Sequence, residues 1–188
     1  MTSSPDLETP IFLLAMPQVR DPFFHKSVVL LIRHEEEGSL GFIVNRRTEL
    51  EIAEILEDLE VEWKGDGESP AFFGGPVNPE RGTLVYLDSE AEGDACIAPG
   101  IAISQNTADL ERVSGMTPEE FRLYLGYAGW GEGQLEREIL RNDWLLAPMS
   151  QELIFADQTD DVWQDAMESV GINTDRLPAW TQDDQGFN

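Results

Sequence analysis

Apolar residues along this chain fall into short, separated runs, most of which predict strands. Runs rich in β-branched and aromatic residues, bounded by Gly, Pro or acidic turns, are typical of buried strands. The second and third runs are separated by Glu35-Glu36-Glu37-Gly38 and predict a hairpin over 27–45. The predicted strands are 11–16, 27–33, 39–45, 71–73, 82–87, 96–98, 101–104, 121–128 and 144–147.

Helical periodicity is confined to a few segments between these runs. Apolar residues recur at helical spacing from Ile52 to Leu59, and Thr48 and Glu51 have the spacing of a capping box. The sequence therefore predicts an amphipathic helix over 49–60 that Thr48 caps. The other predicted helices span 107–113, 134–141 and the segment between a cap at Thr159 and a stop at Gly171.

Strands and helices are mixed without a regular βαβ alternation, and this favours an α+β fold. A chain of 188 residues suits one domain. We expect a single domain over 11–177, a flexible N-terminus over 1–10 and a flexible acidic tail over 178–188.

The charge balance limits the partners. The chain has 37 acidic and 12 basic residues and a net charge of −25. Because nucleic-acid binders neutralise phosphates with cations, nucleic acid is not an expected partner, and neither is an anionic membrane. Lysine occurs only at Lys26 and Lys64. Such an acidic surface suits a protein adapted to high salt, because dissolved ions screen the repulsion between its carboxylates. The alternative is an ordinary acidic protein whose net charge aids solubility.

Apolar runs and the N-terminal segment bear on the compartment. No apolar run approaches the roughly 18 residues of a membrane span. The start of the chain has no basic residue before its short apolar run, unlike a signal peptide. We expect a cytoplasmic protein.

No catalytic or metal-binding motif stands out. His25 and His34 lack the spacing of metal ligands, Cys96 is the only cysteine, and the G-x-S-x-G elbow is absent. We therefore predict no catalytic residue, no metal and no cofactor. Five of the cations lie within 20–47 and form a basic island if the hairpin gathers them; the alternative is that local carboxylates pair with them. They are Arg20, Lys26, Arg33, Arg46 and Arg47.

Two glycine clusters are the remaining candidates for a site. One spans 126–133 before a predicted helix, and the other is Gly74-Gly75 before Pro76. Neither matches G-x-G-x-x-G or a P-loop. Such clusters either expose backbone N–H groups to a ligand or only permit tight turns, and tight turns are the favoured interpretation.

Several of these segments together resemble the AlgH/YqgE family of bacterial proteins over about residues 10–172. The segments are Met16-Pro17-Gln18, Asp21-Pro22-Phe23-Phe24, Ser27-Val28-Val29, Gly41-Phe42-Ile43-Val44-Asn45, Phe73-Gly74-Gly75-Pro76-Val77, and Gly126-Tyr127-Ala128-Gly129-Trp130-Gly131 with Gln134-Leu135-Glu136 and Glu138. The resemblance implies an α+β domain whose bent, largely antiparallel sheet closes into a pseudo-barrel with flanking helices. It implies no required cofactor and no catalytic residue, and one family member is named for a proposed role in regulating alginate production.

Three functions follow as hypotheses. The first is a cytoplasmic, non-enzymatic binding or regulatory protein whose partner is an unknown protein or small molecule. The second is a small-ligand-binding protein or enzyme with a pocket between the two glycine motifs. The third is direct DNA binding, which needs the five N-terminal cations on one face. The pocket residues of the second hypothesis are Asn45, Gly74, Gly75, Tyr127, Trp130 and Gln134.

Overall fold

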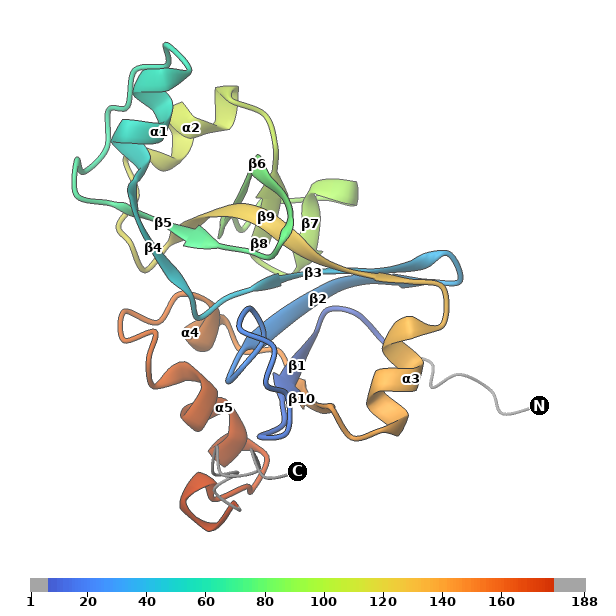
Figure 1. The fold of residues 1–188 in the computed structure, drawn as a ribbon. Coiled ribbons are helices and arrows are strands. Elements are labelled where there is room, and N and C mark those ends of the chain that lie inside the picture. Colours follow the sequence, from blue (N-terminus) through green and yellow to red (C-terminus); the bar gives the residue numbers. More distant parts are fainter. Residues whose placement is uncertain (1–6, 178–188) are drawn as a thin grey trace, which may run out of the picture.

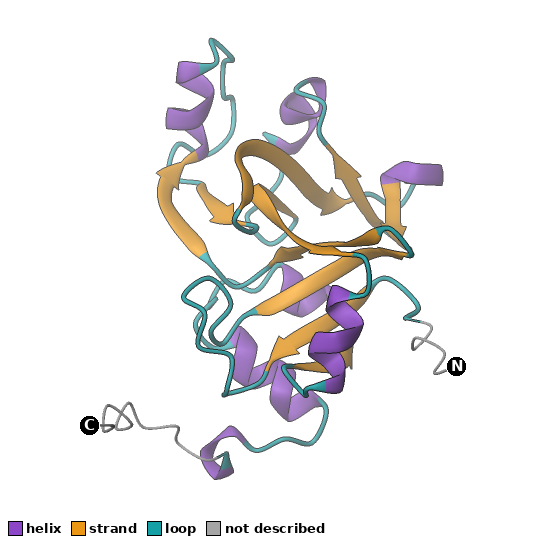
Figure 2. Cartoon of the chain, turned by 45° about the vertical axis from the view of Figure 1, so that its right-hand side comes forward, coloured by secondary structure: helices purple, strands orange, loops and turns teal. Residues whose placement is uncertain are grey.

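The computed structural model describes residues 7–177, in which strands form one curled sheet of mainly antiparallel pairs. The strand order along the sheet is β10-β1-β2-β3-β9-β6-β8-β7, and β4 and β5 pair beside β9. Among the strand pairs formed by residues 7–177, only that of β5 with β9 is parallel. This is the α+β architecture with a bent sheet that the sequence predicted, and Figure 2 shows the curl from the side.

The described elements cover most of the predicted segments. The strands are β1 Ile11–Ala15, β2 Val28–Glu35, β3 Gly38–Ile43, β4 Arg47–Glu51, β5 Pro70–Phe73, β6 Val77–Leu87, β7 Cys96–Ala98, β8 Ile101–Ser104, β9 Phe121–Gly131 and β10 Trp144–Pro148. The helices are α1 Ile52–Asp58, α2 Ala108–Val113, α3 Gln134–Leu140, α4 Gln151–Ile154 and α5 Val162–Ser169, with 3-10 turns at Gly93–Ala95 and Thr174–Arg176.

The sheet has an inner and an outer face, each with its own core. Alternate residues of a strand point to opposite faces. Phe12, Leu30 and Phe42 therefore join the inner core with residues of α4 and α5. Leu13 and Val29 join an outer core covered by α3. A third core lies under α1 and α2, which Figure 1 shows above β6.

Residues 47–51 correct one prediction. The sequence predicted a helix from residue 49 capped by Thr48, but these residues form β4, and α1 begins at Ile52. Arg47 pairs with Phe72 of β5, and Thr48 Oγ1 donates to the Ala71 carbonyl at 2.9 Å. The capping box is made by Glu51 and Glu54 instead. Strand pairing with a distant segment thus overrides the local helix signal.

The last helix also begins later than predicted. Its N-cap is Asp161, whereas Thr159 is buried before the helix. The stop is as predicted, with Gly171 at φ +82° after the last turn. Helix α4 was not predicted at all.

The ends of the chain set the limits of the described structure. The predicted tail over 178–188 and residues 1–6 of the predicted flexible N-terminus lie outside the described residues. Of the remaining N-terminal residues, Leu7 is buried in the outer core. Within 7–177 no helix is both long and apolar enough to cross a membrane.

Candidate functional site

The two glycine motifs meet backbone against backbone. Gly74 N donates to the Leu125 carbonyl and the Gly74 carbonyl accepts from Ile43 N, both at 2.8 Å. A Cβ on Gly75 would lie 2.1 Å from the Tyr127 carbonyl carbon. The structure therefore brings the motifs together but leaves no room for a ligand between these two segments. Neither Gly74 nor Gly75 lines the two cavities described below.

Asn45 holds the entry to β2. Its side chain accepts from Val28 N and donates to the Lys26 carbonyl, each at 2.9 Å, and the residue is buried. Both of its polar functions are thus used by the backbone, and it lines neither cavity. Through these two hydrogen bonds Asn45 connects the chain just after β3 to the start of β2 and the loop before it.

Trp130 and Gln134 belong to a cluster that we call the carboxylate clamp: Trp130, Gln134, Glu138 and Trp144. Glu138 Oε2 accepts from both indole nitrogens at 2.8 Å, and Oε1 accepts from Gln134 Nε2 at 2.9 Å. Gln134 Oε1 in turn accepts from Gly131 N at 3.1 Å. The clamp joins α3 to β9 and to the start of β10.

The carboxylate clamp gives a structural role to the longest of the family motifs, the segment over 126–138. Its polar atoms satisfy one another, and a cavity of about 380 Å³ lies beside it, lined also by Phe24. Glu138, which lies at the centre of this cluster, was not among the site residues predicted from the sequence. The available signal was its i,i+4 spacing from Gln134, which puts both side chains on one helix face.

Arg122 and Tyr124 are buried two residues apart on β9. The Arg122 guanidinium donates to the carbonyls of Phe121 and Ala156 at 3.0 and 2.9 Å, and also to that of Pro118. Burial lowers the pKa of Arg122. Burial also raises the pKa of Tyr124, whose hydroxyl has no hydrogen-bond partner among the described residues. The two groups are enclosed in the inner core and line neither cavity.

Tyr124→Phe is expected to raise the free energy of unfolding at pH 7 by about 1 kcal/mol, because it removes a buried, unpaired hydroxyl. The unfolded tyrosine ionises near pH 10. Because the folded pKa is higher, the folded state keeps the proton longer, and the free energy of unfolding falls as pH rises above about 10. The variant should make that fall shallower. Urea unfolding at pH 7 and above pH 10 measures both effects; a loss of stability at pH 7 would contradict the assignment.

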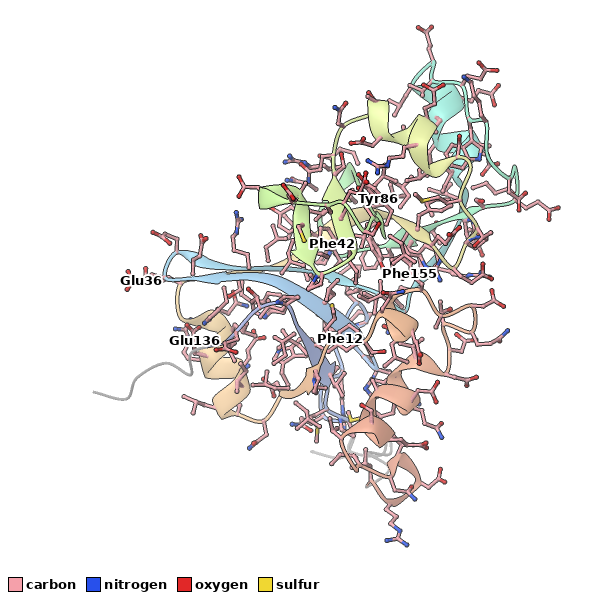
Figure 3. The ribbon with its side chains drawn as sticks, turned by 180° about the vertical axis from the view of Figure 1, so that it is seen from behind. Phe12, Glu36, Phe42, Tyr86, Glu136 and Phe155 are labelled. Atoms are coloured by element: carbon pink, nitrogen blue, oxygen red, sulfur yellow. The ribbon has the colours of Figure 1, made fainter. Side chains whose placement is uncertain are left out.

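A larger cavity lies inside the curl of the sheet, between the β2–β3 hairpin and strands β7 and β8. We call it the concave cavity; its volume is about 820 Å³. Figure 3 places Phe42, one of its lining residues, where these segments face each other. Apolar side chains from five strands line it: Ile32, Leu40, Phe42, Ile97, Ile103 and Tyr127. The polar lining includes Arg33, Glu35, Arg81, Asp94, Cys96 and Gln105.

The concave cavity takes in one predicted site residue, Tyr127. The register pairs Leu40 with Gly129, which carries no side chain. A Cβ on Gly129 would lie 3.3 Å from Tyr127 Cε2, so the Tyr127 ring occupies the space over this glycine. Of the six residues predicted from the sequence, Trp130 and Gln134 line the 380 Å³ cavity and Tyr127 lines the concave cavity. Tyr127 and Trp130 together also line a further cavity of about 310 Å³, whereas Asn45, Gly74 and Gly75 line none of the three.

The structure divides the predicted basic island. Lys26 precedes β2 and Arg33 lies near its other end, roughly 23 Å away at the usual strand rise. Arg47 pairs with Asp157 at 3.5 Å, and Arg46 donates to the His25 carbonyl.

The two histidines lie at separate places in the fold. His25 contacts the Val19 carbonyl, whereas His34 faces Ser39 and Glu136. In residues 7–177 no group of three His, Cys, Asp or Glu residues is placed to hold a metal ion.

Comparison with known proteins identifies close relatives across almost the whole described chain. The family model described as AlgH-like matches residues 12–175. A UPF0301 protein of Methylococcus capsulatus is 40% identical over 170 residues, which cover 88% of this chain and 90% of that protein. A UPF0301 protein of Coxiella burnetii is 35% identical over 168 residues, covering 88% and 91%.

Two solved structures share the fold. The solution structure of the AlgH protein from Pseudomonas aeruginosa superimposes with a TM-score of 0.76 at 31% identity, covering 96% of this chain and 98% of that one. The crystal structure of a Corynebacterium diphtheriae protein gives a TM-score of 0.71 at 26% identity, with 85% of each chain covered.

Proposed function

This chain belongs to the AlgH-like family, and from that premise we propose that it is a non-enzymatic binding protein that holds a small molecule in the concave cavity. The observation that carries the proposal is the cavity itself. Its volume of about 820 Å³ lies in the usual range of ligand sites, roughly 300–1,000 Å³, and such sites often occupy the mouths of curled or closed sheets.

The polar groups around the cavity support binding rather than catalysis. Neither histidine lines it. The Cys96 thiol, which does, donates to the Ala98 carbonyl and has no base beside it in the described hydrogen bonds. A nucleophile without a base is a poor catalyst, whereas a cavity that combines apolar side chains with hydrogen-bonding groups suits reversible binding.

The proposal differs from the pocket first predicted from the sequence. Of the predicted residues only Tyr127 contributes to the concave cavity, while binding at the others stays a prediction. A regulatory role, a cytoplasmic location and adaptation to high salt likewise stay predictions from the sequence.

A cavity-filling variant tests the proposal. Ile103→Trp places an indole in the concave cavity, and Ile139→Trp makes the same change on α3, in the outer core. With the fluorescent neutral probe N-phenyl-1-naphthylamine, we expect Ile103→Trp to weaken binding about tenfold or more, and Ile139→Trp to leave it unchanged. Circular dichroism checks that both variants fold.

Cys96 offers an independent readout because it is the only cysteine of the chain and lines the cavity. The same probe should slow the reaction of Cys96 with a maleimide in the wild-type protein. Equal probe binding by both tryptophan variants, or an unchanged rate at Cys96, would place any binding elsewhere and refute the proposal.

A further inference from the structure

We propose that the ligand of the concave cavity is a small molecule with an anionic group and an apolar body, and that Arg33 and Arg81 receive the anionic group. This inference rests on the proposed function and adds the chemical class of the ligand.

A β-bulge turns Arg33 into the cavity. In β2, Val28 and Leu30 face the inner core, so unbroken alternation would place residue 32 inside and Arg33 outside. The register shifts between Leu31 and Arg33, and Arg33 pairs directly with Leu40, whose side chain lines the cavity. Bulges commonly re-aim a side chain next to a functional site. Here the bulge adds a cation to the part of the cavity that Ile32 and Leu40 line.

Arg81 reaches the same cavity from β6 and is held by a polar relay. Its guanidinium donates to Gln105 Oε1, and Gln105 Nε2 donates to Thr83 Oγ1 at 3.1 Å. Because a guanidinium has five N–H donors, one bond to Gln105 orients it and leaves others for a ligand. Both Arg81 and Gln105 line the cavity.

Arg33 and Arg81 are two cations in a strongly acidic chain. The protein has 37 acidic and 12 basic residues, so carboxylates are available to almost any cation. Among residues 7–177, Arg47, Lys64, Arg112 and Arg141 pair with carboxylates, whereas Arg33 and Arg81 belong to the larger group of cations that do not.

The acids at the cavity leave the arginines available. Glu35 and Asp94 line the same cavity without pairing with them. Unpaired guanidinium groups in an otherwise negative protein favour an anion there, and their planar donor geometry suits carboxylate, sulfonate or phosphate oxygens.

The apolar side chains of the cavity fit an apolar body attached to that anion. Phe42, Ile103 and Tyr127 are half-buried or buried and belong to or border the inner core, so the cavity continues the hydrophobic interior outward. A free inorganic ion would leave these side chains facing water. An amphipathic ligand covers them and gains roughly 25 cal/mol for each Å² of apolar surface removed from water.

Two matched probes separate the anion from the apolar body. 8-Anilinonaphthalene-1-sulfonate and N-phenyl-1-naphthylamine share one ring system, and only the first carries a negative charge. We expect the sulfonate to bind about tenfold more tightly to the wild-type protein. The double variant Arg33→Ala with Arg81→Ala should remove that preference and leave binding of the neutral probe unchanged.

A second double variant controls for net charge. Arg137→Ala with Arg176→Ala removes the same two positive charges at exposed positions that line neither the concave nor the 380 Å³ cavity. It should leave the preference intact, apart from a small effect that salt abolishes. Octanoate and octyl phosphate should displace the sulfonate probe and octanol should not, and the tighter of the two identifies the anionic group.

The outcomes distinguish the inference from the proposed function. If both probes bind at the concave cavity with equal affinity, or if the control variant weakens the sulfonate as much as the cavity variant does, the anionic class is wrong while the binding function stands. If neither probe binds, or if Ile103→Trp leaves both unaffected, the binding function itself fails.

Discussion

Gly75→Ala is expected to destabilise the protein by at least about 3 kcal/mol, which is among the largest effects of a single methyl group. Gly75 has φ +155°, a conformation that L side chains rarely adopt. An added Cβ would lie 2.1 and 2.2 Å from the carbonyl carbon and oxygen of Tyr127 and 2.3 Å from Ala128 N. These atoms are backbone and cannot rotate away, so β9 must move.

The measurement is urea unfolding followed by circular dichroism. Gly131→Ala is the matched control, because it lies on β9 too and an added Cβ there would have no heavy atom within 4 Å. We expect it to change stability by less than about 0.5 kcal/mol. If Gly75→Ala unfolds at the wild-type urea concentration, the close approach of the two glycine motifs is not a requirement of the fold.

Glu138→Ala is the second large effect, with an expected loss of about 3 kcal/mol. The change removes the acceptor of Trp130 Nε1 and Trp144 Nε1 and also the partner of Gln134 Nε2. Both tryptophans are buried, and a buried donor without a partner costs about 1–3 kcal/mol. Glu138→Gln keeps the volume and one acceptor oxygen, so we expect roughly half the loss.

Tryptophan fluorescence follows this unfolding and also reports the polarity around the two indoles. Glu132→Ala serves as the control, since Glu132 is an exposed acid just before α3 with no described hydrogen bond through its side chain. Its expected effect is below about 0.5 kcal/mol. Equal stability of the Glu138 and Glu132 variants would show that the carboxylate clamp contributes nothing to the stability of the fold.

Local sequence patterns predicted most of the strands because each forms a short apolar run between turn residues. Residues 96–98 and 101–104 form strands with the predicted bounds. Strand β9 was predicted over 121–128 but continues to Gly131, because residues 128–131 pair with β3. Glycines weaken the strand signal in a sequence, and only the neighbouring strand compensates for this.

The start of the first helix was predicted wrongly for a similar reason. Capping-box spacing occurs twice, from Thr48 to Glu51 and from Glu51 to Glu54. Local energetics does not separate these two starts strongly. The choice is made by β5, which is distant in sequence and pairs with residues 47–51.

The candidate site was less predictable than the fold. The glycine motifs pointed to the region of β9, and the structure does bring them together. The concave cavity depends on the curl that carries β7 and β8 over the β2–β3 hairpin, and on a one-residue bulge. Strict alternation would have assigned Arg33 to the opposite face of the sheet.

The sequence by itself determined the α+β class, most strands, the net charge of −25 and the family, because these follow from composition, periodicity and short motifs. The tertiary structure alone decided which side chains share a cavity, which cations pair with carboxylates, and that Glu138 joins two tryptophans. The physical reason is that faces, bulges and buried hydrogen bonds depend on pairing between segments far apart in the chain, and such pairing leaves little trace in any local pattern.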